Sequence, residues 1–509
     1  MRTAPVLFLL AGTMLGACSL IPDYERPVPP VASSFPDGPA YQAGAEDNAN
    51  AGGPQAVSAD ALGWRDFFRD PALQRLIDVA LHNNRDLRGA VLNIQAAQAQ
   101  YRIQNSDLFP QIDATGAGQF ERIPGNTSVA FSGAPGAATG STGASTPAST
   151  VASTGNKPIN FRSFSAGIGF TNYELDLFGS VRSLSKQAFE QYLGQMETRR
   201  SAQISLIAEV AGAYFTVLAD RELLRLTEET LKSDTASYEL TKLQLDGGTA
   251  TALAARQAET AVDTARANLI QFTRQEAQDE NALVLLLGQP MPTDLPPRGL
   301  DEEVLVADLP AGLPSDLLTR RPDIVAAEHD LLAANANIGA ARAAFFPSIS
   351  LTAFGGLQSN RLSDLFRAGA LTWSFAPQLN LPIFTAGQNE ASLDLAKVQK
   401  NIQIAQYEKT IQTAFREVSD ALAARGTYGN QLEAQQELVT ATADSLQLSQ
   451  MRFKAGVDSY LPVLDAQLSL YTAQQTLLGL KQVQLTQQAT LYKALGGGWV
   501  EATGQPVSY

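Results

Sequence analysis

Four segments of the chain alternate apolar and polar residues with a period of two, near 110–121, 162–178, 347–357 and 371–384. In the last of them, polar or small residues separate Leu371, Trp373, Phe375, Leu379, Leu381 and Ile383. Successive side chains of a strand point to opposite faces, and about ten residues of a tilted strand cross a bilayer. The pattern therefore predicts membrane strands with lipid on one face and water on the other. A soluble sheet of two hairpins lying on a core has the same periodicity.

The number of these strands constrains the assembly. A bilayer tolerates no open sheet edge, because each unpaired backbone group in hydrocarbon costs several kcal/mol. Bacterial barrels contain at least about eight strands, and one chain supplies the four segments above. No run of about 20 apolar residues follows the N-terminal segment, so we expect no membrane-spanning helix. The strands then require an oligomer, and two, three or four copies satisfy the physical constraint.

Two long segments, 180–245 and 387–454, contain almost no proline and scatter Ala, Gln and Leu along their length. A helix of ~66 residues is on the order of 100 Å long, which no globular core requires. The segment after the second long helix carries residues at alternating steps of three and four, namely Leu461, Leu464, Leu468, Tyr471, Gln475, Leu478, Gln482 and Leu485. This heptad spacing predicts coiled-coil packing against a neighbouring helix.

The chain contains an internal duplication. Residues 86–112 align without gaps with 323–349 at an offset of 237, and 209–288 align with 417–496 at an offset of 208. The first copy therefore has about 29 extra residues, where a Gly-, Ser-, Thr-, Ala- and Pro-rich loop runs over 124–158. We expect one repeat over 62–288, a linker over 289–312, a second repeat over 313–497 and a tail over 498–509. Each repeat reads helix, strand, loop, strand, long helix, turn and helix.

The N-terminus has the form of a secretory signal over residues 1–17, with Arg2 followed by an apolar run. It ends in Leu15-Gly16-Ala17 before Cys18, the only cysteine of the chain, and this resembles the lipobox of bacterial lipoproteins. An ordinary signal peptide with an incidental cysteine is the alternative. Ser19 favours the outer membrane, because Asp at that position resembles an inner-membrane retention signal. Residues 18–61 are then a lipidated, extended tether.

Composition narrows the function classes. The 37 basic and 51 acidic residues give a net charge of −14, which argues against a nucleic-acid partner. Two histidines and one cysteine indicate no disulfide network and no metal site, and nothing in the sequence indicates a cofactor. No phosphate-binding loop and no nucleophile elbow is present, so the sequence does not predict an enzyme.

Several motifs occur together in one order along the chain. They are Ile21-Pro22-Asp23-Tyr24 with Arg26-Pro27, Tyr173 to Gly179 (YELDLFG), Arg321-Pro322-Asp323-Ile324, Ile338 to Pro347 (IGAARAAFFP) and Leu495 to Trp499 (LGGGW). On these motifs the chain resembles the TolC-like outer-membrane factors of tripartite efflux pumps, in the lipoprotein branch typified by OprM. The resemblance extends from Cys18 to about Trp499.

This resemblance implies an α+β membrane protein that forms a homotrimer. Four strands per protomer make a twelve-stranded outer-membrane β-barrel, continuous with a long periplasmic α-helical barrel. It further implies a periplasmic membrane-fusion adaptor and an inner-membrane transporter of the resistance-nodulation-division type as partners, with lipid around the strands. The implied function is a passive exit duct for drugs and other small molecules.

The resemblance also assigns roles near the turns between the long helices. Gly247, Gly248 and Thr249 in the first turn, and Gly456, Val457 and Asp458 in the second, are expected to face the adaptor. Leu461 and Asp465 are the expected periplasmic gate, as an apolar constriction and a negative ring. From the residues alone, Leu461 is equally a seam residue and Asp465 a solvated acid that the helix dipole favours.

The chain departs from the family at two positions beside the gate. Ala254 stands where members commonly carry an acidic residue, and Pro462 replaces a commoner non-proline. A polar bridge that closes the channel is therefore weaker or differently placed, with Arg452, Lys454 and Asp458 as candidate substitutes. Other functions left open are a periplasmic scaffold without a pore, an outlet for secreted proteins and an outlet for metal ions.

Overall fold

The computed structural model describes residues 19–41, 59–123, 158–293, 295, 299–300 and 314–503. Cys18, the signal segment and nearly all of the loop insertion lie outside these residues. The elements are η1 (Pro39–Tyr41), α3 (Trp64–Phe67), α4 (Pro71–Asn83), α5 (Arg85–Ser106), β1 (Asp113–Ile123), β2 (Ile159–Leu175), α6 (Ser180–Asp246), α7 (Ala252–Leu287), α8 (Pro314–Arg320), α9 (Pro322–Ala343), β3 (Ser348–Ser359), η2 (Leu362–Asp364), β4 (Leu371–Asn380), α10 (Gln388–Lys454) and α11 (Leu461–Ala494).

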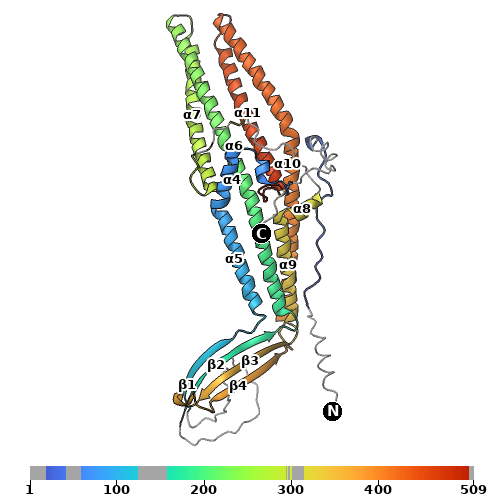
Figure 1. Ribbon diagram of the computed structural model, residues 1–509. Coiled ribbons are helices and arrows are strands. Elements are labelled where there is room, and N and C mark those ends of the chain that lie inside the picture. Colours follow the sequence, from blue (N-terminus) through green and yellow to red (C-terminus); the bar gives the residue numbers. More distant parts are fainter. Residues whose placement is uncertain are drawn as a thin grey trace. The chain divides into compact units, whose positions relative to one another are not determined.

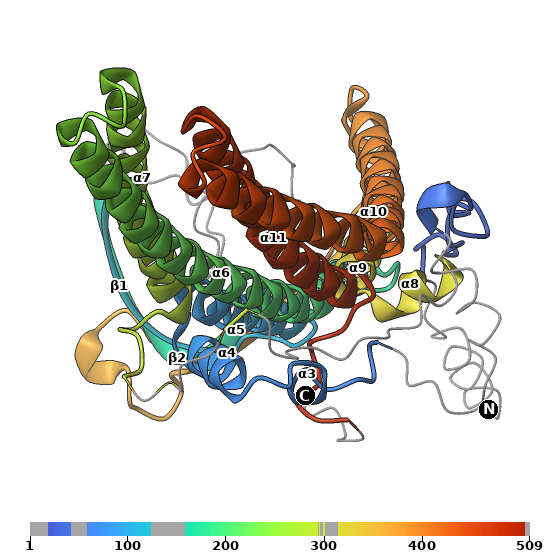
Figure 2. The same ribbon diagram turned by 90° about the horizontal axis from the view of Figure 1, so that it is seen from above.

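The order of these elements repeats. The series α4, α5, β1, β2, α6, α7 returns as α8, α9, β3, β4, α10, α11, which is the order that the duplication predicts. Helices α6 and α10 each contain 67 residues and lie within a residue or two of the predicted ranges. Figures 1 and 2 show that α6 and α7 form one hairpin and α10 and α11 a second.

The chain forms two compact units that do not follow the two repeats. The first contains residues 1–26, 96–192 and 330–403, and the second contains residues 27–95, 193–329 and 404–509. Each unit therefore combines segments of both copies.

The first unit contains a four-stranded antiparallel sheet in the order β1-β2-β3-β4. Leu371 of β4 pairs with Leu357 of β3, and Leu357 pairs with Ala166 of β2. Because directly paired residues share a face of the sheet, this register collects the apolar members of all four segments on one face. Leu371 and Trp373 are both 78% exposed on that face. In the described residues nothing covers it as the core of a soluble sheet would.

The junction between strand and long helix explains one sequence motif. Asp176 accepts hydrogen bonds from the backbone N–H of Val181 (3.3 Å) and of Arg182 (2.9 Å), and from the Arg182 Nε (2.9 Å). Gly179, with φ +76°, turns the chain into α6. The acid therefore binds the free N–H groups at the start of a 67-residue helix, where a negative charge also complements the helix dipole.

The N-terminal tether packs along α9 in the same unit. Asn335 donates from Nδ2 to the carbonyl of Pro22 (2.8 Å), and Arg342 donates from Nη1 to the carbonyl of Leu20 (3.2 Å). A methyl group in place of a hydrogen of Gly339 would lie 2.6 Å from Ile21 Cγ1, so this close approach requires glycine. Residue 20 therefore lies beside Arg342, close to the end of α9 that leads into β3.

The core of the second unit contains Trp64, Phe67, Phe68, Phe215, Ile207 and Tyr492, each at most 2% exposed. Helix α6 includes a stretch that is long and apolar enough to cross a membrane, which corrects the expectation that no such stretch follows the N-terminus. In the structure 56% of that stretch is buried, and Val210, Ala211 and Phe215 are completely covered. Its apolar character is explained by packing in this core.

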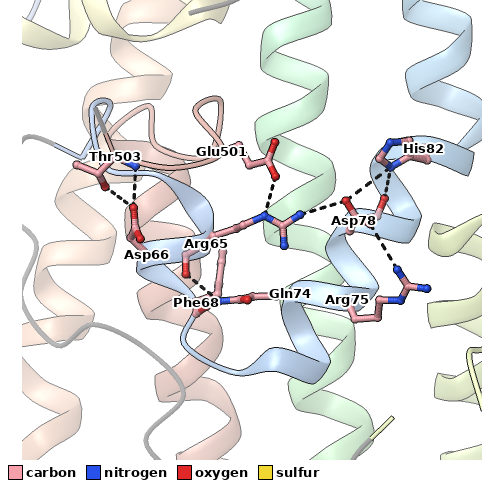
Figure 3. A network of polar contacts seen from close by, with 9 residues as sticks. All are labelled: Arg65, Asp66, Phe68, Gln74, Arg75, Asp78, His82, Glu501 and Thr503. Atoms are coloured by element: carbon pink, nitrogen blue, oxygen red, sulfur yellow. Dashed lines mark hydrogen bonds and ion pairs between the residues drawn. The ribbon is translucent and has the colours of Figure 1, made fainter. Parts of the chain in front are cut away.

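A polar network joins the C-terminal segment to α3 and α4 (Figure 3). Arg65 donates to Glu501 (2.7 Å) and to Asp78 (3.2 Å), and Thr503 donates to Asp66 through its backbone N–H (2.7 Å) and its hydroxyl (2.6 Å). The carbonyls of residues 500 and 501 accept from the backbone N–H groups of Trp64 and Arg65. The segment after α11 thus caps the start of α3.

Candidate functional site

The two turns between the long helices have the same hydrogen-bonding pattern. In the first, the N–H of Thr249 reaches the carbonyl of Gln244 (2.8 Å); in the second, the N–H of Val457 reaches the carbonyl of Arg452 (3.0 Å). Gly248 and Gly456 have φ of +74° and +72°, as this helix ending requires. Each pair of equivalent residues is separated by 208 positions, so the duplication predicted from the sequence holds at the level of single hydrogen bonds.

Arg452 and Asp458 pair with each other across the second turn. The guanidinium donates from Nη2 to Oδ1 (3.0 Å), and Nε donates to Oδ2. The hydrogen bonds from Arg452 hold the pKa of the Asp458 carboxyl below its usual range. Both residues therefore brace their own turn within one chain, while Lys454 lies exposed with no ion pair to any described residue.

An apolar cluster joins the two hairpins just below the turns. Its buried members are Ala258, Tyr460 and Val463, with Ala254 and Phe453 packed against them. The rings of Phe453 and Tyr460 meet edge to face with centroids 5.4 Å apart. Ala254 is thus an apolar contact at the position where the resemblance leads one to expect an acid.

A buried polar seam continues from this cluster between α6 and α11. Tyr460 donates to Gln467 Oε1 (3.4 Å), and the hydroxyls of Thr227 and Tyr471 are 2.8 Å apart. Asp234 is 7% exposed, and burial raises its pKa to about 6. Burial and the nearby charge of Asp234 also raise the pKa of Tyr460.

The sequence predictions did not include this polar seam, although a signal for it is present in the chain. Helix α6 carries polar residues seven apart at Asp220, Thr227, Asp234 and Thr241. Residues seven apart lie on nearly the same side of a helix, so this spacing marks a polar stripe along α6. Asp234, Thr227 and Thr241 of this stripe are buried.

The heptad prediction for α11 is correct at Tyr471, which is buried, and at Leu464, which packs against the apolar cluster, but it is wrong at Leu461 and Leu468. Leu461 and Leu468 are 45% and 60% exposed, whereas Val463, Ala466 and Leu477 are buried. The buried side also includes Ala, Gln and Tyr residues, which let α11 approach its neighbours closely. Leu461 and Leu468 lie on a second face, together with exposed Asp465. Leu461, Asp465 and Leu468 therefore form a stripe, spaced four and three residues apart, that is largely exposed in the described part of the chain.

Comparison with known proteins places this architecture. The family described as outer membrane efflux protein matches residues 76–289 and 313–497. The toluene efflux pump outer membrane protein TtgC of Pseudomonas putida is 53% identical over 97% of this chain and 95% of its own length. The outer membrane protein OprJ of Pseudomonas aeruginosa is 42% identical over 97% of this chain and 95% of its own length.

Solved structures agree with the sequence relatives. The open-state outer membrane channel MtrE of Neisseria gonorrhoeae superposes with a TM-score of 0.81 at 38% identity, covering 96% of this chain and all of that one. Such structural neighbours are trimeric channels with a helical barrel and four strands per protomer. The predicted fold class and outer-membrane location are thereby confirmed, and so is the prediction that the protein is not an enzyme. With both repeats matched and relatives aligned over nearly its whole length, the chain belongs to the outer membrane efflux protein family.

Proposed function

We propose that this chain is the outer-membrane exit duct of a tripartite pump for antibiotics and apolar organic compounds. Relatives named for toluene efflux and for antibiotic efflux, TtgC and ArpC of Pseudomonas putida, are both 53% identical to it. The duct is passive, and an inner-membrane transporter of the resistance-nodulation-division type supplies the driving force. A periplasmic adaptor links the two, and it contacts the turns at Gly247, Gly248 and Thr249 and at Gly456, Val457 and Asp458.

The observation that carries the mechanism is the exposed stripe on α11. Leu461 is 45% exposed directly beside Tyr460 and Val463, which are 4% and 3% exposed. The stripe therefore faces away from the packing of its own protomer, and in a trimer it is available to face the axis. Three copies of Leu461 would narrow the tunnel with apolar side chains. Three copies of Asp465, one helical turn on, would repel anions and hold cations.

The gate is tested with the double variant Leu461→Ser and Asp465→Ala. We expect higher single-channel conductance in planar bilayers and greater uptake of large antibiotics by cells, because the apolar and charged rings are both removed. The matched control is Leu438→Ser with Glu437→Ala, an exposed pair on α10. Conductance and uptake equal to those of the control would contradict the gate assignment.

The lock on this gate is proposed to be largely apolar. Ala254 and Ala258 on α7 contact Tyr460 and Val463 at the start of α11, so closing needs no ion pair at residue 254. The Arg452–Asp458 pair stiffens the second turn, and Lys454 remains available to a neighbouring protomer or to the adaptor. Arg452 and Asp458 bond each other within one turn. They can bridge the helix pairs only if, in the trimer, they exchange these bonds for bonds to another helix pair.

Lipidation of Cys18 is the last part of the proposal. Residues 20–22 are held along α9 close to β3, two residues from Cys18 in sequence. An acyl chain on Cys18 would therefore begin close to the periplasmic end of the strands, where the inner leaflet of the outer membrane lies. We expect labelled palmitate to be incorporated into the wild-type protein and not into Cys18→Ser. Continued incorporation in that variant would exclude Cys18 as the anchor.

A further inference from the structure

The outer end of the sheet carries a charge opposite to that of the whole chain. The strand ends and the segments that join them at this end, 121–162 and 359–370, contain five basic and two acidic residues. Their net charge is +3, whereas the chain as a whole has −14. The long loop between β1 and β2 contributes no acidic residue, since residues 124–157 contain neither Asp nor Glu. This end is the one remote from α5 and α6, so it faces the cell exterior.

The strand register places Arg162 and the residues that lead to Arg361 at the same end of the sheet. Arg162 of β2 pairs with Phe120 of β1, and Phe164, two residues on, pairs with Ser359 of β3. Arg361 follows Ser359 by two residues, just beyond the last residue of β3 that pairs with β2, so it lies at the same end of the sheet as Arg162. Arg162 shares the apolar face with its partner Phe120. These arginines therefore stand where the lipid-facing band ends.

Three of the four arginines at this end have no acidic partner in the described part of the chain. Arg122, Arg162 and Arg361 are exposed and pair with no acidic residue in the described part of the chain. Arg367, the fourth, is 3.2 Å from Asp364, and its side chain is 74% exposed. The cationic surface is thus built mainly from side chains whose charge is not neutralised by the described residues.

Large apolar side chains border the arginines. Phe120 is 68% exposed and meets Phe164 edge to face at 5.4 Å, while Leu362 and Phe366 are 61% and 79% exposed on the loop between β3 and β4. A surface that combines exposed guanidinium groups with apolar side chains is complementary to an amphiphilic ligand with anionic and apolar parts. The acyl chains of such a ligand would lie along the apolar band. Its phosphate groups would accept hydrogen bonds from the arginines, because the planar set of N–H donors of a guanidinium fits phosphate oxygens.

We propose that the outer rim formed by Arg122, Arg162, Arg361 and Arg367 is a binding surface for the phosphorylated glycolipid of the outer leaflet, lipopolysaccharide. The inference rests on the sheet crossing the outer membrane and is independent of the gate and of the exported compounds. Bound glycolipid would seal the boundary between the channel and the leaflet, which matters for a duct that releases membrane-active compounds at that surface.

The test measures binding of diphosphoryl lipid A to the purified full-length trimer in phosphatidylcholine nanodiscs. We expect Arg162→Gln with Arg361→Gln to weaken binding by about tenfold or more, because two charge-assisted contacts are lost. Arg416→Gln, an exposed arginine on α10 whose only described partner is Asp420, serves as control and leaves binding unchanged. Equal affinity of wild type and double variant would overturn the proposal.

Two further arms use the wild-type protein, so they do not depend on how a variant folds. Dephosphorylated lipid A should bind about tenfold or more weakly than the diphosphoryl form, and equal binding would overturn the role of phosphate. Phosphatidylglycerol at the same charge density should not displace lipid A, and full displacement would overturn the choice of glycolipid. Single-channel conductance of the double variant is recorded in parallel. A normal conductance with lost lipid binding separates this proposal from that of the exit duct.

Discussion

Asp234 is a buried carboxylic acid on α6, in the packing next to the turns. It is 7% exposed on α6, close enough to Tyr460 of α11 for its charge to raise the pKa of that phenol. Removal from water disfavours the carboxylate and raises its pKa from 3.8 to about 6. At neutral pH this packing therefore contains an ionised group that weakens it.

The replacement Asp234→Asn should remove a pH-dependent loss of stability. Below the unfolded-state pKa both states are protonated and the residue contributes nothing. As the pH rises towards about 6 the unfolded state ionises first, so stability falls, by about 2–3 kcal/mol per protomer at most. We expect the wild type to lose thermal stability between about pH 4 and pH 7 and Asp234→Asn to lose less.

The control for this prediction is Asp246→Asn, which removes an exposed acid at the end of the same helix. It should follow the pH profile of the wild type. A profile of Asp234→Asn that is parallel to the wild type would show that Asp234 titrates normally in the folded protein.

The charged residues beside the proposed gate show what sequence does and does not determine at this scale. Arg452, Lys454 and Asp458 were recognisable as a group because the turn leaves few other charges nearby. Arg452 binds Asp458 and not a partner on α7. The reason is the turn at Gly456, whose φ of +72° brings residue 458 back over the last turn of the helix. The sequence showed that Ala254 departs from the acidic residue common at this position. Its contact with the Tyr460 cluster could not be predicted, because that contact depends on how the two hairpins pack.

At the scale of elements, the end of the chain has a structural role. The start of α3 has backbone N–H groups with no partner inside the helix, and the carbonyls of residues 500 and 501 accept from two of them, at 2.9 and 3.1 Å. Hydrogen bonds from Thr503 also lower the pKa of Asp66, the acid in the first turn of α3. Helix α3 has only four residues, so these external contacts decide whether it forms.

Removing residues 500–509 should therefore destabilise the second unit. Loss of the cap and of the Asp66 contact should cost on the order of 2–4 kcal/mol, since the N–H groups are left without partners. Thermal unfolding followed by circular dichroism measures the effect. A truncation that removes only residues 504–509 keeps the contacts of residues 500–503 and should leave the melting temperature unchanged. Equal stability of both truncations would show that the segment is only an appendage.

The long elements were predictable because their patterns extend over many residues. Helices α6 and α10 end within about a residue of the predicted ranges, and neither contains a proline that would interrupt it. The buried face of α11 was predicted only in part, because leucines lie on both faces of this helix, with Leu477 on the buried face and Leu461 on the exposed one. Periodicity identified the leucine stripe of Leu461 and Leu468. Contacts were needed to show that the buried face belongs to Val463, Ala466 and Leu477.

At the scale of the whole molecule, the sheet determines that one chain is not enough. Its four strands expose apolar side chains on one face, and strands β1 and β4 each leave an edge unpaired within the described part of the chain. The trimer resolves both features, because edges pair between protomers and the apolar faces turn to lipid. The alternative of a soluble sheet on a core fails at Trp373, which is 78% exposed.

Neighbouring residues of β4 offer a direct test of which face meets lipid. Phe375 pairs with Ala353 on the apolar face, and Ser374 pairs with Phe354 on the opposite face. A lysine on the lipid face of a barrel costs about 2–4 kcal/mol near the bilayer midplane and little on the water side. Phe375→Lys should therefore reduce the amount of trimer in outer-membrane fractions severalfold, whereas Ser374→Lys should assemble normally and make the channel more anion-selective. Because the two positions are adjacent, a general intolerance of strand β4 would affect both alike. Equal loss of trimer in the two variants, or unchanged ion selectivity in Ser374→Lys, would show that these faces are assigned wrongly.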